Sequence, residues 1–97
     1  MTQYVRRQYD RIRVNWQIKV IPLKNKTSIY DIYLFDISSG GMSFTCDAEI
    51  NVSLGDILIA RFPFGSLKIK IVWFLEKTYG AMFMDSVSKL IIAQYLQ

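Results

Sequence analysis

Histidine is absent from this 97-residue chain, and cysteine occurs once, at Cys46. Without histidine, the sequence lacks the side chain that most often acts as a general base at neutral pH, which argues against a hydrolase or a transferase. The lone cysteine has no second cysteine and no histidine with which to form a disulfide or a zinc site. Carboxylates such as Asp47, Glu49, Asp56 and Glu76 show no pairing typical of acid–base catalysis. We therefore expect a protein that is not an enzyme and that uses neither a metal nor a cofactor.

Long apolar runs are missing as well. The longest candidates, residues 57–60 and 71–75, suit buried strands and are too short to span a membrane. The first residues are polar and include arginines, without the apolar stretch of a secretory signal. We therefore expect a cytoplasmic protein without membrane insertion, and the length fits one domain.

Apolar residues make up 52% of the chain and aromatic residues 14%, which excludes a disordered protein. Tyr, Phe, Ile and Val are abundant and Ala is scarce, which favours strands over helices. The net charge is +4, and residues 1–26 carry seven Arg and Lys against one Asp. An anion-binding site and a solvated basic tail are both consistent with this concentration of charge.

Alternating apolar and polar side chains, with turn signals between them, predict six short strands. These strands are predicted at residues 14–20, 29–37, 42–46, 57–64, 67–73 and 79–84. A helix is predicted to follow, capped by Ser86, with an apolar stripe of Val87, Leu90 and Ile91. This order of elements predicts an antiparallel barrel or sandwich, and closure of the sheet into a barrel would remove the exposed edges.

The aromatic residues are predicted to belong mainly to the core. Trp73 is predicted to lie on the same face of its strand as Leu67, Ile69 and Ile71, which favours a core position for the indole over contact with a ligand. The aromatic side chains of the second predicted strand, Tyr30, Tyr33 and Phe35, are likewise expected in the core.

Arg7 and Arg11 lie four residues apart and follow Arg6, so one helical turn or one folded loop would bring the two guanidinium groups together. A guanidinium group offers a planar fork of donors for phosphate oxygens or the acceptor edge of guanine, and it also stacks on a base. The same spacing is common on solvated helices, so this motif alone does not identify a site.

A second motif spans residues 36–41, Asp-Ile-Ser-Ser-Gly-Gly. Asp36 is a natural acceptor for the N1 and N2 donors of guanine, and Ser38 can add a hydroxyl. Gly40 and Gly41 allow positive φ and leave space for a ligand near the backbone. An ordinary turn between two strands explains this segment equally well.

Together, Arg7-x-x-x-Arg11 and Asp36-x-Ser38-x-x-Gly41 resemble the signature of PilZ domains. Residues 71–73 resemble the Val-Val-Trp strand of that family, and residues 79–83 resemble its Gly-x-x-Phe strand. The resemblance extends over nearly the whole chain, from Val5 to Leu96.

The resemblance implies a six-stranded antiparallel β-barrel at residues 14–84, a flexible ligand-binding arm at 1–13 and a C-terminal α-helix at 85–97. It implies cyclic di-GMP as the ligand, with phosphates and guanine held by Arg7 and Arg11 and a guanine edge bonded by Asp36 and Ser38. Gly41 would keep the floor of the binding site open. Gly40 and Trp73 are further candidates for contact with the ligand. Arg6 occupies the position that the family associates with binding a stacked dimer of the ligand.

This resemblance predicts a signalling receptor or adaptor whose arm orders on ligand binding and changes the surface that a protein partner meets. The partner would belong to motility, pilus or polysaccharide machinery. Two alternatives are a PilZ-fold interaction module without nucleotide binding and a small β-barrel that binds single-stranded nucleic acid. The intact motifs argue against the first alternative. The confinement of the excess charge to the arm argues against the second.

Overall fold

A computed structural model describes residues 11–84 together with residues 91 and 94. The described chain contains six strands, as the sequence predicted. They are β1 (Ile12–Pro22), β2 (Tyr30–Ile37), β3 (Gly41–Thr45), β4 (Ile57–Phe62), β5 (Gly65–Leu75) and β6 (Thr78–Phe83). The predicted strand ends differ from these by at most two residues. The predicted helix and residues 1–10 of the arm lie outside the described residues, apart from residues 91 and 94.

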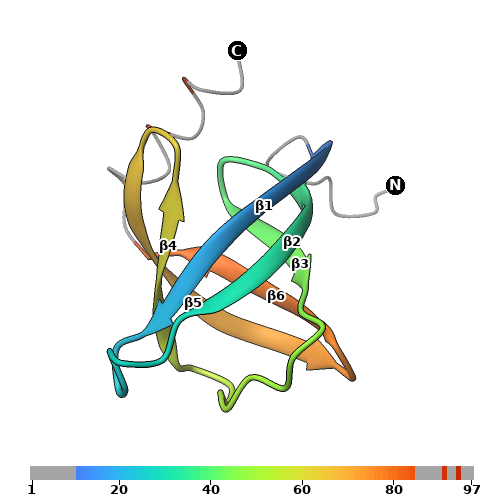
Figure 1. Cartoon of the computed structure of the whole chain (residues 1–97). Coiled ribbons are helices and arrows are strands. Elements are labelled where there is room, and N and C mark those ends of the chain that lie inside the picture. Colours follow the sequence, from blue (N-terminus) through green and yellow to red (C-terminus); the bar gives the residue numbers. More distant parts are fainter. Residues whose placement is uncertain (1–10, 85–90, 92–93, 95–97) are drawn as a thin grey trace.

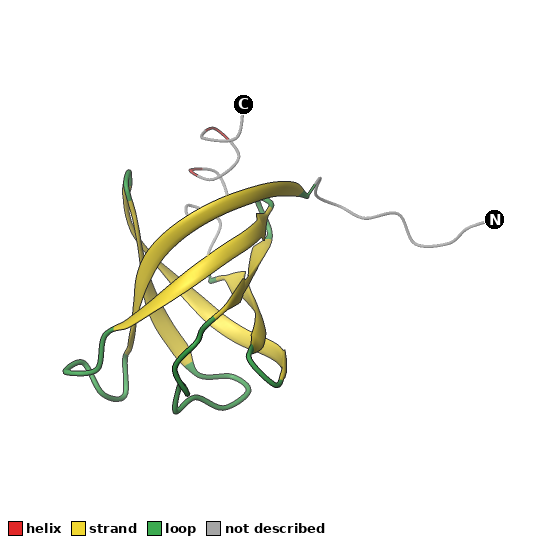
Figure 2. Ribbon diagram, turned by 45° about the vertical axis from the view of Figure 1, so that its right-hand side comes forward, coloured by secondary structure: helices red, strands yellow, loops and turns green. Residues whose placement is uncertain are grey.

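The six strands close into a barrel in the order β1-β2-β3-β6-β5-β4, with every neighbouring pair antiparallel (Figure 1). The closing contact joins β1 to β4, where Lys19 lies opposite Arg61 and Pro22 opposite Leu58. Figure 2 shows the strands wrapping around one interior while the loops lie at the ends. The prediction of an antiparallel barrel is confirmed, and β1 and β4 pair along most of β4 instead of presenting two open edges.

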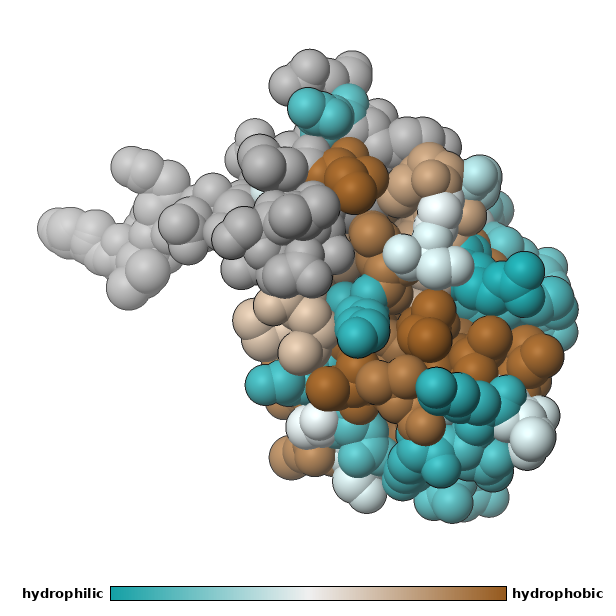
Figure 3. Space-filling model, turned by 90° about the vertical axis from the view of Figure 1, so that its left-hand side faces the viewer, coloured by the Kyte–Doolittle hydropathy of each residue, from teal (hydrophilic) through white to brown (hydrophobic). Residues whose placement is uncertain are grey.

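The interior is filled by the alternate side chains of every strand. Ile32 and Leu34 of β2, Phe44 of β3, and Ile69 and Ile71 of β5 are all buried. In β2 and β5 the neighbouring residues Asp31, Tyr33, Lys68 and Val72 are exposed, as the alternation of a pleated strand requires. The outer surface is not uniformly polar, because apolar residues form a band across one face of the barrel (Figure 3).

Three of the predicted core positions are wrong. Tyr33 and Phe35 are exposed because they alternate with Ile32 and Leu34, which occupy the inner face of β2, whereas Tyr30 packs partly buried against the core as predicted. Trp73 is 42% exposed. The pairing of β5 with β6 shifts register between Ile71 and Trp73, and the extra residue turns the indole to the outside of the barrel.

Candidate functional site

An ion pair links the arginine-rich N-terminal segment to the second motif. Nη1 of Arg11 lies 2.9 Å from Oδ1 of Asp36, although the two residues are 25 positions apart in sequence. Arg11 stands immediately before β1, and Asp36 lies near the end of β2, where the two strands pair antiparallel with Arg13 opposite Asp36. The side chains are 44% and 20% exposed, so the pair lies at the surface.

The turn after β2 is held by Ser38. Its hydroxyl oxygen accepts hydrogen bonds from the backbone N–H groups of Gly40, at 3.2 Å, and Gly41, at 3.3 Å. The N–H of Ser38 donates to the carbonyl oxygen of Gly41 at 2.9 Å, and the residue is only 7% exposed. These bonds give Ser38 a structural role in the turn. Its contact with a guanine edge stays a prediction.

Gly41 is required by the close approach of β6. A Cβ atom at this position would overlap the carbonyl oxygen of Ala81, so only glycine lets β3 and β6 pair here. Neither motif glycine adopts the positive φ that glycine allows. In the described chain, the glycines with positive φ are Gly55 and Gly65. Gly40 instead ties the turn to β6, because its carbonyl oxygen accepts the N–H of Phe83 at 3.1 Å.

Trp73 lies at the other end of a row of residues that begins at Asp36. Asp36 is opposite Ser43 of β3, Ser43 is opposite Gly80 of β6, and Gly80 is opposite Trp73 of β5. The Trp73 indole lies over Gly80, because a Cβ atom there would overlap the indole nitrogen. The row therefore places an acidic group and a half-exposed aromatic ring on the outside of the same part of the barrel.

A register shift also follows Leu34 in the pairing of β2 with β3, where Phe35 is the extra residue. Phe35 is exposed and precedes Asp36, so it adds apolar surface next to the carboxylate. Sequence reasoning missed this role for Phe35 and the role of Gly80. The only available signal for Gly80 was its place in the motif at residues 79–83, because bulges leave no regular trace in the alternation of side chains.

The predicted site residues are thus only partly placed. The structure brings Arg11 and Asp36 into contact and puts Ser38, Gly40 and Gly41 in the adjoining turn. Arg6 and Arg7 lie outside the described residues. Within residues 11–84, His, Cys, Asp and Glu form no group of three that could hold a metal ion. No helix in the described part is both long enough and apolar enough to cross a membrane.

Comparisons with known proteins agree on the fold. The model of the PilZ domain family matches residues 5–97. An inhibitor of motility from Bacillus subtilis, MotI/DgrA, has a similar structure, with a TM-score of 0.71 and 14% identity over 97% of this chain. YcgR from Escherichia coli, solved in complex with c-di-GMP, has a TM-score of 0.66 and 18% identity over 94% of this chain. The chain spans about half the length of these two neighbours, 50% and 44%. A comparison with curated proteins found no match.

Proposed function

This chain belongs to the PilZ domain family, and on that premise we propose that it is a receptor for the second messenger cyclic di-GMP. The observation that carries the proposal is the ion pair between Arg11 and Asp36. It places the last arginine of one motif against the first residue of the other, so two segments far apart in sequence form one surface. The family match indicates a receptor or adaptor domain and no catalytic family.

The two partners of this ion pair offer complementary groups to a cyclic dinucleotide. Arg11 uses one terminal nitrogen on Asp36, which leaves further N–H donors for a phosphate oxygen or for O6 and N7 of guanine. Asp36 uses Oδ1, which leaves Oδ2 to accept a guanine N–H. We propose that Arg7 supplies the second guanidinium group.

The turn beside the ion pair would act through its shape. Ser38 is buried and bonded to two backbone N–H groups, so it holds residues 38–41 in position next to Asp36. Trp73 is proposed as a contact for the ligand from β5, because its indole is half-exposed on the row of residues that leads to Asp36.

We propose that the N-terminal segment changes its conformation when the ligand binds and so transmits the signal. Arg6, Arg7, Arg11 and Arg13 repel one another, and two ligand phosphates would neutralise this repulsion and fold the segment over the barrel. A protein partner in the cytoplasm would then meet a changed surface. Motility, pilus and polysaccharide machineries are the candidate partners. Motility machinery should be tested first, because one structural neighbour is an inhibitor of motility.

Calorimetric titration with cyclic di-GMP tests the proposal. We expect submicromolar to micromolar affinity, which corresponds to a binding free energy of about −8 kcal/mol or better. Single-stranded oligonucleotides should compete only at concentrations that are orders of magnitude higher. Absence of heat at high ligand concentration would reject the receptor function, whereas equal competition by oligonucleotides would favour a nucleic-acid binder.

A further inference from the structure

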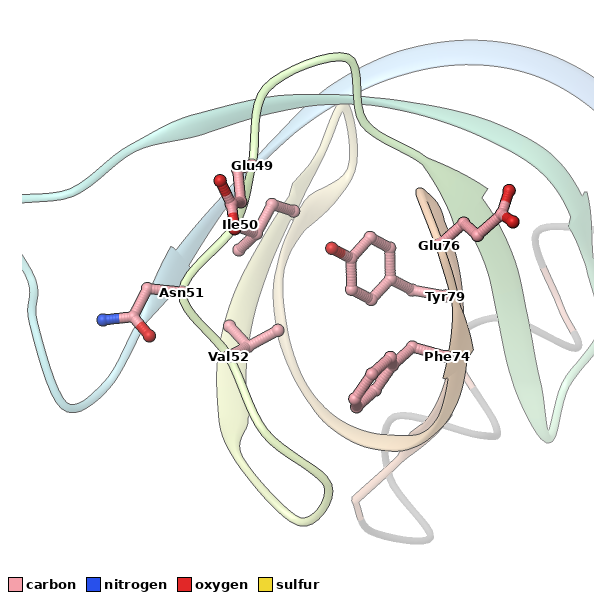
Figure 4. Close-up of a pocket in the computed structure, with 7 residues that line it drawn as sticks. All are labelled: Glu49, Ile50, Asn51, Val52, Phe74, Glu76 and Tyr79. Atoms are coloured by element: carbon pink, nitrogen blue, oxygen red, sulfur yellow. The ribbon is translucent and has the colours of Figure 1, made fainter.

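A pocket of about 570 Å³ opens at the end of the barrel away from the Arg11–Asp36 pair. Along β3 and β6, the register runs from Gly41 opposite Met82, beside the motif, to Thr45 opposite Thr78, beside the pocket. The pocket lies between the β5–β6 hairpin and the loop after β3 (Figure 4). It is lined by Glu49, Ile50, Asn51, Val52, Phe74, Glu76 and Tyr79.

One wall of this pocket is aromatic. The Phe74 and Tyr79 rings lie next to each other with their centroids 6.1 Å apart (Figure 4). Tyr79 stacks in turn on the buried Phe44 at 5.3 Å, so the wall is anchored in the core. Phe74 is 48% exposed and presents its ring to the pocket. Ile50 and Val52 supply the facing side from the loop (Figure 4). The wall is therefore rigid at its base and accessible at its rim.

The rim of the pocket is acidic. Asp31, Asp36 and Asp56 each form an ion pair, whereas within residues 11–84 Glu49 and Glu76 form none. Asp47 lies two residues before Glu49 and is also without an ion pair among the described residues. Lys77 follows Glu76 on the hairpin turn, but its ammonium group does not lie within ion-pair distance of any of these carboxylates. Of the three described carboxylates that lack a cationic partner, Glu49 and Glu76 thus line this pocket.

The charge of Glu49 acts on the aromatic wall. The pKa of Tyr79 lies above its ordinary value, chiefly because burial disfavours the phenolate, and the negative charge of the Glu49 carboxylate also raises it. The electrostatic field of the rim therefore extends to the Tyr79 hydroxyl and would favour a cation near it.

We propose that this pocket binds an arginine side chain presented by a protein partner. A guanidinium group stacks on an aromatic ring and at the same time donates a fork of hydrogen bonds to carboxylates. Phe74 offers the ring, and the exposed side chains of Glu49 and Glu76 can turn to receive the fork. Apolar neighbours of that arginine would pack against Ile50 and Val52. The site lies at the other end of the barrel from the proposed nucleotide site and does not depend on it.

The probe for this proposal is N-acetyl-arginine amide, titrated into the isotope-labelled full chain and followed by two-dimensional NMR. We expect millimolar affinity, with chemical-shift changes concentrated at residues 49–52 and 74–79. N-acetyl-citrulline amide has nearly the same shape without the charge, and it should bind at least about tenfold more weakly because it lacks the charge-assisted bonds.

Charge-neutralising variants assign the effect to the rim. Glu49→Gln and Glu76→Gln alter exposed side chains, so the fold should persist, and each should weaken binding of the arginine probe by about threefold. Asp31→Asn removes the same charge from an exposed carboxylate that pairs with Lys19, and it should leave the affinity unchanged.

Three results would overturn the proposal. The first is binding of citrulline equal to that of arginine, and the second is no shift at the pocket. The third is a change in the chemical shifts of the pocket residues when only the protein concentration is raised, provided that this change is absent in the double variant Arg6→Ala and Arg7→Ala. The occupant of the pocket would then be a second copy of this chain. None of these results bears on cyclic di-GMP binding, which the calorimetric titration measures separately.

Discussion

Replacement of Arg11 by alanine separates a role in ligand binding from a role in folding. In the structure, Arg11 contributes one surface ion pair to Asp36, with side chains 44% and 20% exposed. Pairs of this kind stabilise a protein by about 0.5 kcal/mol, since water screens the charges. For a domain of this size, that loss lowers the melting temperature by about 2–4 °C.

The expected effect of Arg11→Ala on binding is much larger. Loss of a guanidinium fork from a phosphate or a guanine, in a contact from which water is excluded, costs about 2–4 kcal/mol. Because each 1.4 kcal/mol corresponds to a factor of ten, the affinity for cyclic di-GMP should fall by about 30-fold to 700-fold. Calorimetric titration measures the affinity, and thermal melting without ligand measures the stability. Arg7→Ala should cause a similar loss of affinity.

Lys19→Ala is the matched control. Lys19 and Asp31 form the same kind of ion pair across β1 and β2, at 2.6 Å, with both side chains 53% exposed. The substitution removes one positive charge, as Arg11→Ala does, but at a distance from the second motif. It should produce a comparable small change in melting temperature and no change in affinity. Wild-type affinity in Arg11→Ala, or an equal loss in Lys19→Ala, would refute the assignment of Arg11 to the site.

The same surface and the core yield four further predictions. Asp36→Ala should weaken cyclic di-GMP binding, and wild-type protein should bind cyclic di-AMP poorly because adenine lacks the donors that Asp36 accepts; equal affinity of the wild type for both nucleotides would contradict this role of Asp36. The wild type should bind two cyclic di-GMP molecules per chain and Arg6→Leu one, because four phosphate charges need an additional cation; a calorimetric ratio of one in the wild type, or of two in the variant, would disprove it. Gly80→Ala should displace the Trp73 indole, cost about 1–3 kcal/mol of stability and shift tryptophan emission to longer wavelength, whereas an unchanged spectrum would show that the ring does not cover Gly80. Burial raises the pKa of the Cys46 thiol, so less thiolate is present at any given pH, and a thiol reagent should label the native protein far more slowly than the denatured one; equal rates would argue against burial.

Part of the site was predictable because its chemistry is local. The spacing of Arg7 and Arg11 and the run from Asp36 to Gly41 are visible in the sequence without any fold. Their contact was not visible, since 25 residues separate Arg11 from Asp36 and only the pairing of β1 with β2 brings them together. The role of Ser38 was also not predictable, because the sequence does not distinguish a serine whose hydroxyl stabilises a turn from a serine whose hydroxyl faces a ligand.

The number of strands, their approximate bounds and most of the side chains that fill the barrel can be predicted from the amino-acid sequence. Apolar residues recur with the period of a strand, and that period is a property of the local chain. The positions at which this period is interrupted depend on how the strands pair in the folded barrel. At Phe35 and immediately before Trp73, one strand has one residue more than the strand with which it pairs. Such a β-bulge depends on hydrogen bonds between strands that are distant in sequence. The pocket between Glu49 and Tyr79 also depends on the tertiary structure, because its two walls come together only when β3 pairs with β6.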